Sequence, residues 1–150
     1  FKGETMYTNR IFFIREENDI KQKDLANILN ISQSLISRWE SGTDIPSIKR
    51  INILSNYYKI SLDYIFNFTN EKSYNNSTYK EIDKIVVGKR LQSIRKKYNL
   101  TLRALATELN TTSSTLSAYE SGKTLILTAF AIQICKKYNI SLDWLYGKIN

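Results

Sequence analysis

The chain has 150 residues and carries 22 lysines and arginines against 14 aspartates and glutamates, a net charge of +8 at pH 7. It contains no histidine and one cysteine, which excludes zinc sites built from Cys and His, His-based catalytic triads and an intrachain disulfide. Without an apolar run of membrane-spanning length or a recognisable signal peptide, we expect a cytoplasmic protein that does not enter the membrane.

The positive charge is concentrated in the second half of the chain. Residues 1–70 contain nine Lys and Arg against eight Asp and Glu, whereas residues 85–150 contain ten against three. A strongly basic half indicates a polyanionic partner, most often nucleic acid. The alternative is a charged surface that contacts only solvent.

Apolar residues at helical spacing predict five helices in the first part of the chain. The expected ranges are 7–18, 22–29, 32–40, 47–58 and 62–66. Ser32 and Ser61 stand where they can cap two of these helices, and Gly42 ends the third. The five residues before Met6 are expected to precede the natural start. Residues 69–80 are polar and rich in Asn and Ser, which predicts a linker.

The same order of elements returns 80 residues later. Helices are expected from about Glu81 to Tyr98, after Thr101, after Thr112, over 125–138 and after Ser141. Laid over residues 10–67 without a gap, residues 90–147 are identical at 17 of 58 positions. The sequence therefore predicts an all-α chain with two tandem copies of one fold, at 6–68 and 81–149. Cys135 lies in an apolar-periodic stretch, so we expect a buried thiol.

The second and third helices of each copy form the central feature of the pattern. In the first copy a turn at Asn30–Ile31 joins them, and the third helix keeps Ile36 and Trp39 for the interior. Its other face carries short and medium polar side chains. Two helices joined by such a turn, with a polar outer face on the second, fit the major groove of DNA.

These residues resemble the Cro/C1-type helix-turn-helix family of phage repressors and bacterial regulators. The signature residues are Gln22, Leu25, Ala26, Ile31, Ser32, Ile36, Ser37, Trp39, Glu40, Gly42, Pro46 and the run 61–65. The resemblance implies two lambda-repressor-like domains of five helices each. It also implies that Gln22 contacts a phosphate and braces Gln33, which then reads a base edge.

The resemblance assigns DNA contacts to both copies. The assigned residues are Gln22, Ser32, Gln33, Ser34, Ser37, Arg38 and Thr43 in the first copy, and Arg103, Thr112, Ser113, Ser114, Ser117 and Lys123 in the second. The second copy has Leu102 in place of the phosphate-contacting glutamine and lacks long side chains on its recognition face. We therefore hypothesise that the first copy reads sequence and the second holds the phosphate backbone.

Two pairs of opposite charge occur at matching positions in the copies. Arg15 with Glu40 and Arg95 with Glu120 match a family pair that links the first helix to the end of the recognition helix. We expect an ion pair in each copy, with the structural role of fixing the angle of that helix.

The sequence thus predicts a transcription regulator, a repressor of phage or mobile-element type, that occupies an operator in double-stranded DNA. It predicts no catalysis, no cofactor and no metal. A homodimer and a protein partner such as an antirepressor are further expectations. The alternative is an antitoxin or regulatory interaction module in which one copy binds a partner protein.

Overall fold

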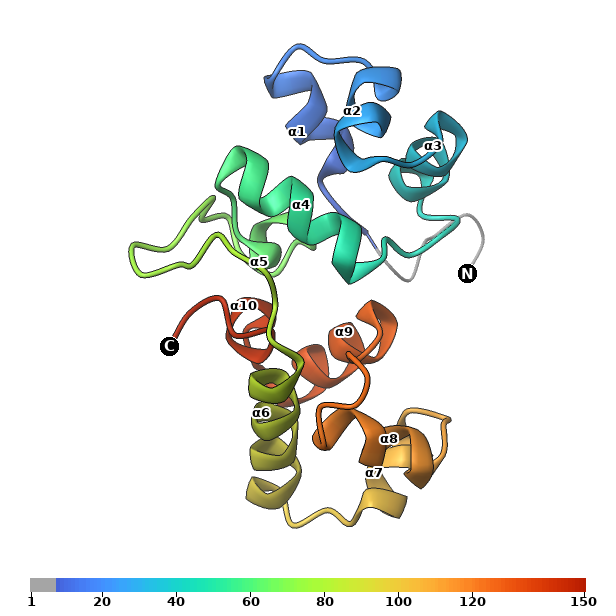
Figure 1. Ribbon diagram of the computed structural model, residues 1–150, viewed down its shortest axis with the longest axis vertical. Coiled ribbons are helices and arrows are strands. Elements are labelled where there is room, and N and C mark those ends of the chain that lie inside the picture. Colours follow the sequence, from blue (N-terminus) through green and yellow to red (C-terminus); the bar gives the residue numbers. More distant parts are fainter. Residues whose placement is uncertain (1–7) are drawn as a thin grey trace. The chain divides into compact units, whose positions relative to one another are not determined.

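A computed structural model describes residues 8–150, in which all regular secondary structure is helical (Figure 1). The expected start at Met6 and the first expected helical residue, Tyr7, lie outside the described residues. The chain forms two compact units that divide between Tyr79 and Lys80. Within the described part, no helix combines the length and apolar character needed to cross a membrane.

Unit one contains the five helices in the predicted order. They are α1 (Ile11–Glu17), α2 (Gln22–Leu29), α3 (Gln33–Ser41), α4 (Ile48–Tyr58) and α5 (Leu62–Ile65). Each contributes apolar side chains to one core, in which Ile11, Leu29, Ile36, Ile51 and Ile65 are fully buried. The five short helices stabilise one another by this shared burial, because isolated helices of this length are unstable in water.

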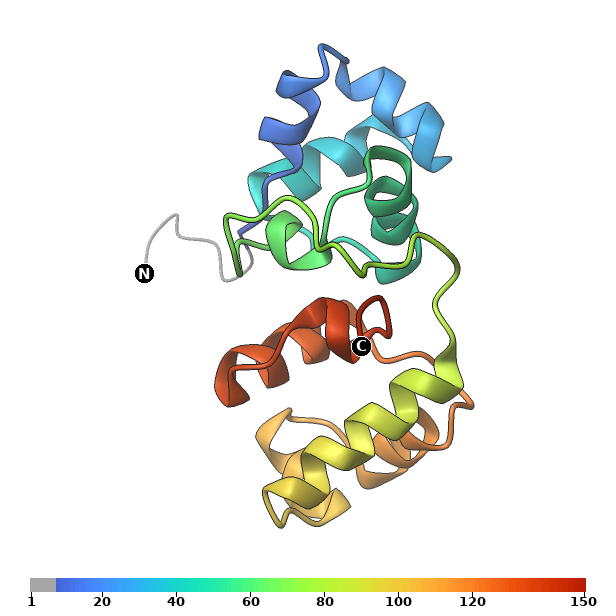
Figure 2. The same ribbon diagram turned by 90° about the vertical axis from the view of Figure 1, so that its left-hand side faces the viewer.

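Unit two repeats the arrangement with α6 (Lys84–Lys97), α7 (Leu102–Glu108), α8 (Ser113–Glu120), α9 (Thr128–Tyr138) and α10 (Leu142–Leu145). Figure 2 shows α6 along its full length. Cys135 is buried, as predicted. The core of this unit includes Leu91, Leu105, Leu116 and Leu145.

Two helix starts in unit two differ from the prediction. The helix expected from Glu81 begins at Lys84, because Asp83 caps it by accepting a hydrogen bond from the Ile85 N–H at 2.9 Å. The helix expected from residue 125 begins at Thr128, since Leu127 is extended at φ −64° and ψ 145°. The apolar spacing just before it comes from a buried loop residue, Ile126, which is 1% exposed.

The start of α9 allows a stability prediction. In unit one Ser47 caps α4 by accepting a hydrogen bond from the Arg50 N–H at 3.3 Å. Its counterpart Leu127 provides no cap, and its side chain is 57% exposed. We expect Leu127→Ser to raise the free energy of unfolding of unit two by about 1 kcal/mol. Urea denaturation followed by the NMR signals of unit two measures this change.

The matched control is Ser47→Ala, which should lower the free energy of unfolding of unit one by about the same amount, ~1 kcal/mol. An unchanged or lower stability of Leu127→Ser would show that the leucine packs at the start of α9.

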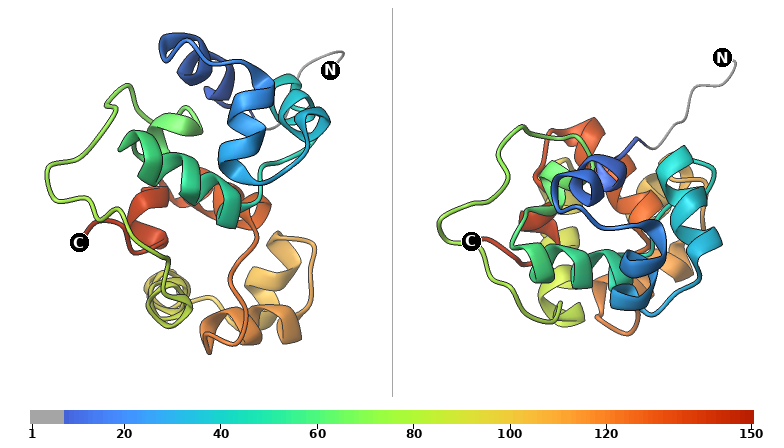
Figure 3. Two further views of the ribbon diagram at one scale, coloured as in Figure 1. Left: turned by 45° about the horizontal axis from the view of Figure 1, so that its top comes forward. Right: turned by 90° about the horizontal axis from the view of Figure 1, so that it is seen from above.

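Residues 69–74, named here the strap, lie in the loop that follows α5 at the end of unit one (Figure 3). Arg10 Nη1 donates to the Thr69 carbonyl at 2.6 Å, and the Ser61 N–H donates to the Lys72 carbonyl at 2.6 Å. Lys72 Nζ also lies 2.6 Å from Glu17 Oε2. The strap falls in the stretch that its composition assigned to the linker, and it contacts α1 and the N-terminal end of α5.

Candidate nucleic-acid interface

The turn between α2 and α3 is set by a left-handed residue. Asn30 ends α2 at φ 54°, a region that asparagine tolerates better than most residues. The next N–H, of Ile31, donates back to the Ala26 carbonyl at 3.0 Å. In unit two Asn110 has φ 57° and the Thr111 N–H donates to the Ala106 carbonyl at 2.9 Å. Both units therefore form the same helix-turn-helix.

The N-terminal half of α3 presents polar side chains to solvent. Ser32 Oγ caps the helix by accepting from the Leu35 N–H at 3.2 Å. Ile36 and Trp39 are buried at 0% and 2% exposure, which turns the residues at other helical phases outward. The predicted contact residues Ser32, Gln33, Ser34, Ser37 and Arg38 are all exposed.

The C-terminal end of α3 holds its arginine in place. Arg38 Nε lies 2.7 Å from Asp44 Oδ2 in an exposed ion pair. Gly42 ends the helix at φ 77°, which glycine adopts without strain. Beyond it, exposed Thr43 forms a hydrogen bond of 2.8 Å between its Oγ1 and Ser41 Oγ. The ion pair uses Nε of Arg38 and leaves the donors of its two terminal nitrogens for another acceptor.

Gln22 makes a different contact from the one that the resemblance implies. Its Nε2 donates to Glu40 Oε1 at 3.0 Å, so the amide is directed at the end of α3 and not at Gln33. A carboxylate is a stronger acceptor than a neutral amide, which favours this orientation. The half-buried Gln22 side chain thereby joins the ion pair of unit one.

The ion pairs at Glu40 and Glu120 have the same geometry in both units. Arg15 donates from Nε and Nη2 to the two carboxylate oxygens of Glu40, at 2.8 and 3.1 Å. Arg95 donates to Glu120 at 2.6 and 3.0 Å. The carboxylate raises the pKa of each arginine, mainly through these hydrogen bonds. Each pair ties the first helix of a unit to the end of its recognition helix.

The corresponding face of unit two carries shorter side chains. Thr112 caps α8 by accepting from the Thr115 N–H at 3.1 Å, and Ser114 and Ser117 are exposed. Ser113 is half-buried, as is Ala118, which stands at the position of Arg38. Short hydroxyl side chains discriminate poorly among base edges.

The basic charge of unit two is only partly available to a ligand. Arg95 is paired with Glu120, and Lys137 Nζ lies 2.8 Å from Glu108. Lys148 is 2% exposed, and burial lowers its pKa to about 8. Other exposed cations of unit two, among them both predicted phosphate contacts, include Lys84, Lys89, Lys96, Lys97, Arg103, Lys123 and Lys136.

Sequence reasoning did not assign a structural role to a second arginine that both copies share. Arg10 Nη1 donates to the Tyr64 carbonyl at 2.6 Å and its guanidinium lies 4.3 Å from the Tyr64 ring centroid. Arg90 contacts Trp144 in the same two ways, with 4.9 Å to the ring centroid. The signal in the sequence was that both copies have an arginine at this position and an aromatic residue 54 positions after it. Each arginine connects the start of a unit to its last helix.

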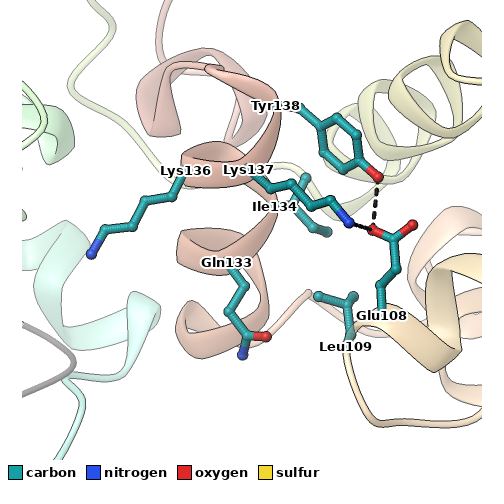
Figure 4. Close-up of a pocket in the computed structure, with 7 residues that line it drawn as sticks. All are labelled: Glu108, Leu109, Gln133, Ile134, Lys136, Lys137 and Tyr138. Atoms are coloured by element: carbon teal, nitrogen blue, oxygen red, sulfur yellow. Dashed lines mark hydrogen bonds and ion pairs between the residues drawn. The ribbon is translucent and has the colours of Figure 1, made fainter.

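A surface pocket of about 450 Å³ lies between the end of α7 and α9 (Figure 4). Glu108 Oε1 accepts from Lys137 at 2.8 Å and from the Tyr138 hydroxyl at 2.7 Å. Lys137 lowers the pKa of Glu108, whereas burial and Glu108 raise the pKa of Tyr138 to about 12. The three groups hold α9 against α7. In residues 8–150 no cluster of three His, Cys, Asp or Glu residues could hold a metal ion.

The chain is similar in sequence to two proteins named as transcription regulators. The chain is 24% identical over 86 residues to the HTH-type transcriptional activator BcrR of Enterococcus faecalis, covering 55% of this chain and 42% of that protein. It is 27% identical over 66 residues to the HTH-type transcriptional regulator YobD of Bacillus subtilis (strain 168), covering 44% and 59%. The chain thus spans about half the length of these relatives.

A solved structure, the clp gene regulator ClgR from C. glutamicum, matches 46% of this chain and 90% of its own at 22% identity and a TM-score of 0.40. Two family models match the chain itself, "Helix-turn-helix" over residues 12–65 and "Helix-turn-helix domain" over residues 88–150. The two family matches confirm the predicted fold. The chain belongs to the Cro/C1-type helix-turn-helix family, with two such domains in tandem.

Proposed function

We propose that this regulator binds a specific operator and represses transcription by occupying it. The observation that carries the proposal is the exposed polar half of α3, held at a fixed angle by the largely buried pair Arg15–Glu40. Gln33 stands at the start of this helix, where a recognition helix contacts base edges. Its amide can donate to and accept from an adenine edge at the same time.

The two units divide the work in this proposal. Unit one supplies sequence discrimination through Gln33, Ser34 and Ser37. Unit two supplies phosphate contacts through Arg103 and Lys123, both exposed beside a recognition face of short side chains. Thr112, Ser113, Ser114 and Ser117 add hydrogen bonds with weak base preference. In this proposal the base contacts and the phosphate contacts are made by different copies of one fold.

The division of labour predicts two distinct defects. Gln33→Ala should cost about 1–3 kcal/mol on the preferred operator and little on other sequences, because a base contact is lost. Arg103→Ala with Lys123→Ala should weaken all sequences alike and reduce the slope of log affinity against log salt by about 2, since two phosphate contacts are lost. Fluorescence anisotropy with operator and scrambled duplexes across a salt series measures both.

A uniform loss of affinity in both variants would contradict the division. The matched control is Lys96→Ala with Lys136→Ala, which makes the same change of net charge at exposed residues that are not predicted to contact DNA. It should leave the salt slope unchanged.

The sign of regulation has its own test. BcrR is named as an activator, so the relatives do not favour repression. Occupancy of an operator that overlaps a promoter lowers transcription without any further contact. A reporter with the operator moved from the promoter core to a site upstream of it distinguishes the two: a repressor loses its effect, whereas an activator gains one.

An interaction module is the second candidate, and one feature of unit two favours it. A groove of about 430 Å³ beside α8 is lined in part by Ala118, Leu125 and the exposed Leu127. Exposed aliphatic groups beside the recognition helix suit a protein partner better than DNA. Selection of bound duplexes from a random pool decides: an enriched palindrome indicates a homodimer reading through α3, and no enrichment favours the module.

A further inference from the structure

The turn after α3 returns the chain to the side of Arg38. Gly42 leaves the helix in the left-handed region at φ 77°. The N–H groups of Thr43 and Asp44 then donate to the Arg38 carbonyl at 2.9 and 3.2 Å. In the same turn the Asp44 carboxylate Oδ2 accepts from Arg38 Nε at 2.7 Å. The backbone of the turn therefore places an acceptor at one nitrogen of the guanidinium.

This ion pair leaves the outer end of the guanidinium for a ligand. Asp44 occupies Nε of Arg38, and Nη1 and Nη2 carry all the remaining N–H donors of the group. Two parallel donors of this kind match the O6 and N7 acceptors on the major-groove edge of guanine. An arginine that is already held at Nε has less side-chain freedom to lose when it binds. The pair thus prepares Arg38 for a bidentate contact.

Unit two shows that the turn does not need the ion pair. The N–H groups of Lys123 and Thr124 donate to the Ala118 carbonyl at 3.0 and 3.2 Å, which is the same turn. Ala118 and Thr124, which stand at the two positions of the pair, carry no charge. The side chains of Arg38 and Asp44 are 48% and 41% exposed, and a pair this exposed adds little to stability. The pair is therefore explained better by a role in DNA contact than by a role in folding.

The carboxylate also changes what Arg38 prefers to bind. Asp44 offsets the positive charge of the arginine and repels a phosphate that approaches it. A guanine edge presents two acceptor atoms without a net charge, so the carboxylate repels it less. The pair therefore favours a base edge over the DNA backbone.

We propose that Asp44 is a positioning residue, which holds Arg38 in place to read a guanine of the operator. Nη1 and Nη2 of Arg38 donate to O6 and N7 of this guanine, while Nε remains bound to Asp44. Arg38 follows Gln33 by five residues, a rise of about 7.5 Å along the helix, so the two side chains contact different base pairs. The inference rests on the proposed function, because it assigns one base of the operator that unit one binds.

The test begins with the operator that the full chain selects from a random pool of duplexes. Each guanine of this operator is replaced in turn by adenine, which presents an amino donor in place of O6. Fluorescence anisotropy then gives the loss of affinity at each position. At one guanine we expect the unchanged chain to lose affinity about tenfold, and Arg38→Ala should abolish the loss at that guanine alone.

Variants of Asp44 separate positioning from charge. Asp44→Ala should reduce the loss at this guanine to about threefold or less and steepen the salt slope by about 1, because the freed arginine contacts a phosphate. Asp44→Asn keeps an oxygen acceptor for Nε and should retain most of the tenfold loss. Both variants keep the backbone N–H that donates to Arg38. Glu71→Gln removes the same charge at an exposed residue outside the helix-turn-helix, and it should change neither quantity.

The outcomes separate this inference from the proposed function. An operator in which no guanine depends on Arg38 would overturn the inference and leave the proposed function standing. An unchanged guanine preference in Asp44→Ala would also overturn it, since Arg38 would then need no positioning. If Arg38→Ala weakens all duplexes alike, the arginine contacts a phosphate and the inference is wrong. A pool in which no sequence is enriched would overturn the proposed function, and the inference with it.

Discussion

Glu120→Ala should remove most of the stability of unit two. The Arg95 and Glu120 side chains are 14% and 6% exposed, and truncation of the carboxylate leaves the guanidinium with one remaining bond, to the Leu100 carbonyl at 2.9 Å. Breaking a buried ion pair from one side costs about 3–5 kcal/mol. A domain of this size has a total stability of roughly 5 kcal/mol, so the loss is close to the whole.

Far-UV circular dichroism and the NMR spectrum of the full chain measure this loss. Glu40→Ala is the matched variant in unit one, where the side-chain exposures are 11% and 8%. It should be at least as harmful, because Gln22 loses its acceptor as well. Arg95→Met combined with Glu120→Leu should recover much of the stability, since both charges are then removed together. A loss below about 1 kcal/mol for Glu120→Ala would instead indicate the energetics of an exposed ion pair.

Gly88→Ala should also destabilise unit two, against the usual rule for helices. An added Cβ at Gly88 would lie 2.5 Å from the carbonyl oxygens of both Tyr119 and Glu120. These are backbone atoms at the end of α8, so the contact can be relieved only by moving α8 away from α6. Glycine to alanine inside a helix normally gains about 1 kcal/mol. Here we expect a net loss of about 1–3 kcal/mol, as in overpacked cores.

Urea denaturation of the full chain gives the sign of this change. Lys89→Ala is the control, because it alters an exposed neighbour in the same turn of α6 and should change stability by less than about 0.5 kcal/mol. If Gly88→Ala stabilises unit two, α6 and α8 can separate at little cost. The ion pair between Arg95 and Glu120 would then carry less of the contact between these helices.

The helix caps were the most predictable part of the fold. Ser32, Ser61, Thr101, Thr112 and Ser141 were each identified from a hydroxyl residue before an apolar-periodic run. In the structure each accepts a hydrogen bond from a backbone N–H three residues later. Capping is a local interaction, so a single sequence contains the information that it needs.

Helix starts without such a local signal were predicted less well. The apolar residues 125–127 continue the helical spacing of the apolar residues that follow them. In the structure, however, Ile126 is buried in a loop and Leu127 has an extended backbone. Periodicity reports burial, and a buried loop gives the same pattern as the first turn of a helix. The same limit applies to α6, whose exposed Ile85 and Val86 extend the apolar pattern without entering the core.

For the candidate interface, the sequence predicted which side chains are exposed but not which side chains pair with one another. Gln33, Ser34 and Ser37 are exposed as their helical phase required. The pairing of Arg38 with Asp44 and of Gln22 with Glu40 depends on how the end of α3 folds back, which no local pattern reports. The composition of the strap is that of a linker, and its contacts with α1 and α5 become evident only in three dimensions.

The closure of unit one by Arg10 sets an order of events during synthesis. This arginine binds Thr69 and Asn70, which follow it by 59 and 60 residues. The helix-turn-helix is complete much earlier along the chain, yet the Arg10 side chain gains these two partners only after the strap has left the ribosome. Contacts so distant in sequence form late in folding, and domains tend to fold as units from the N-terminus during translation. The nascent chain therefore contains its recognition helix before Arg10 can form the hydrogen bonds that complete the domain.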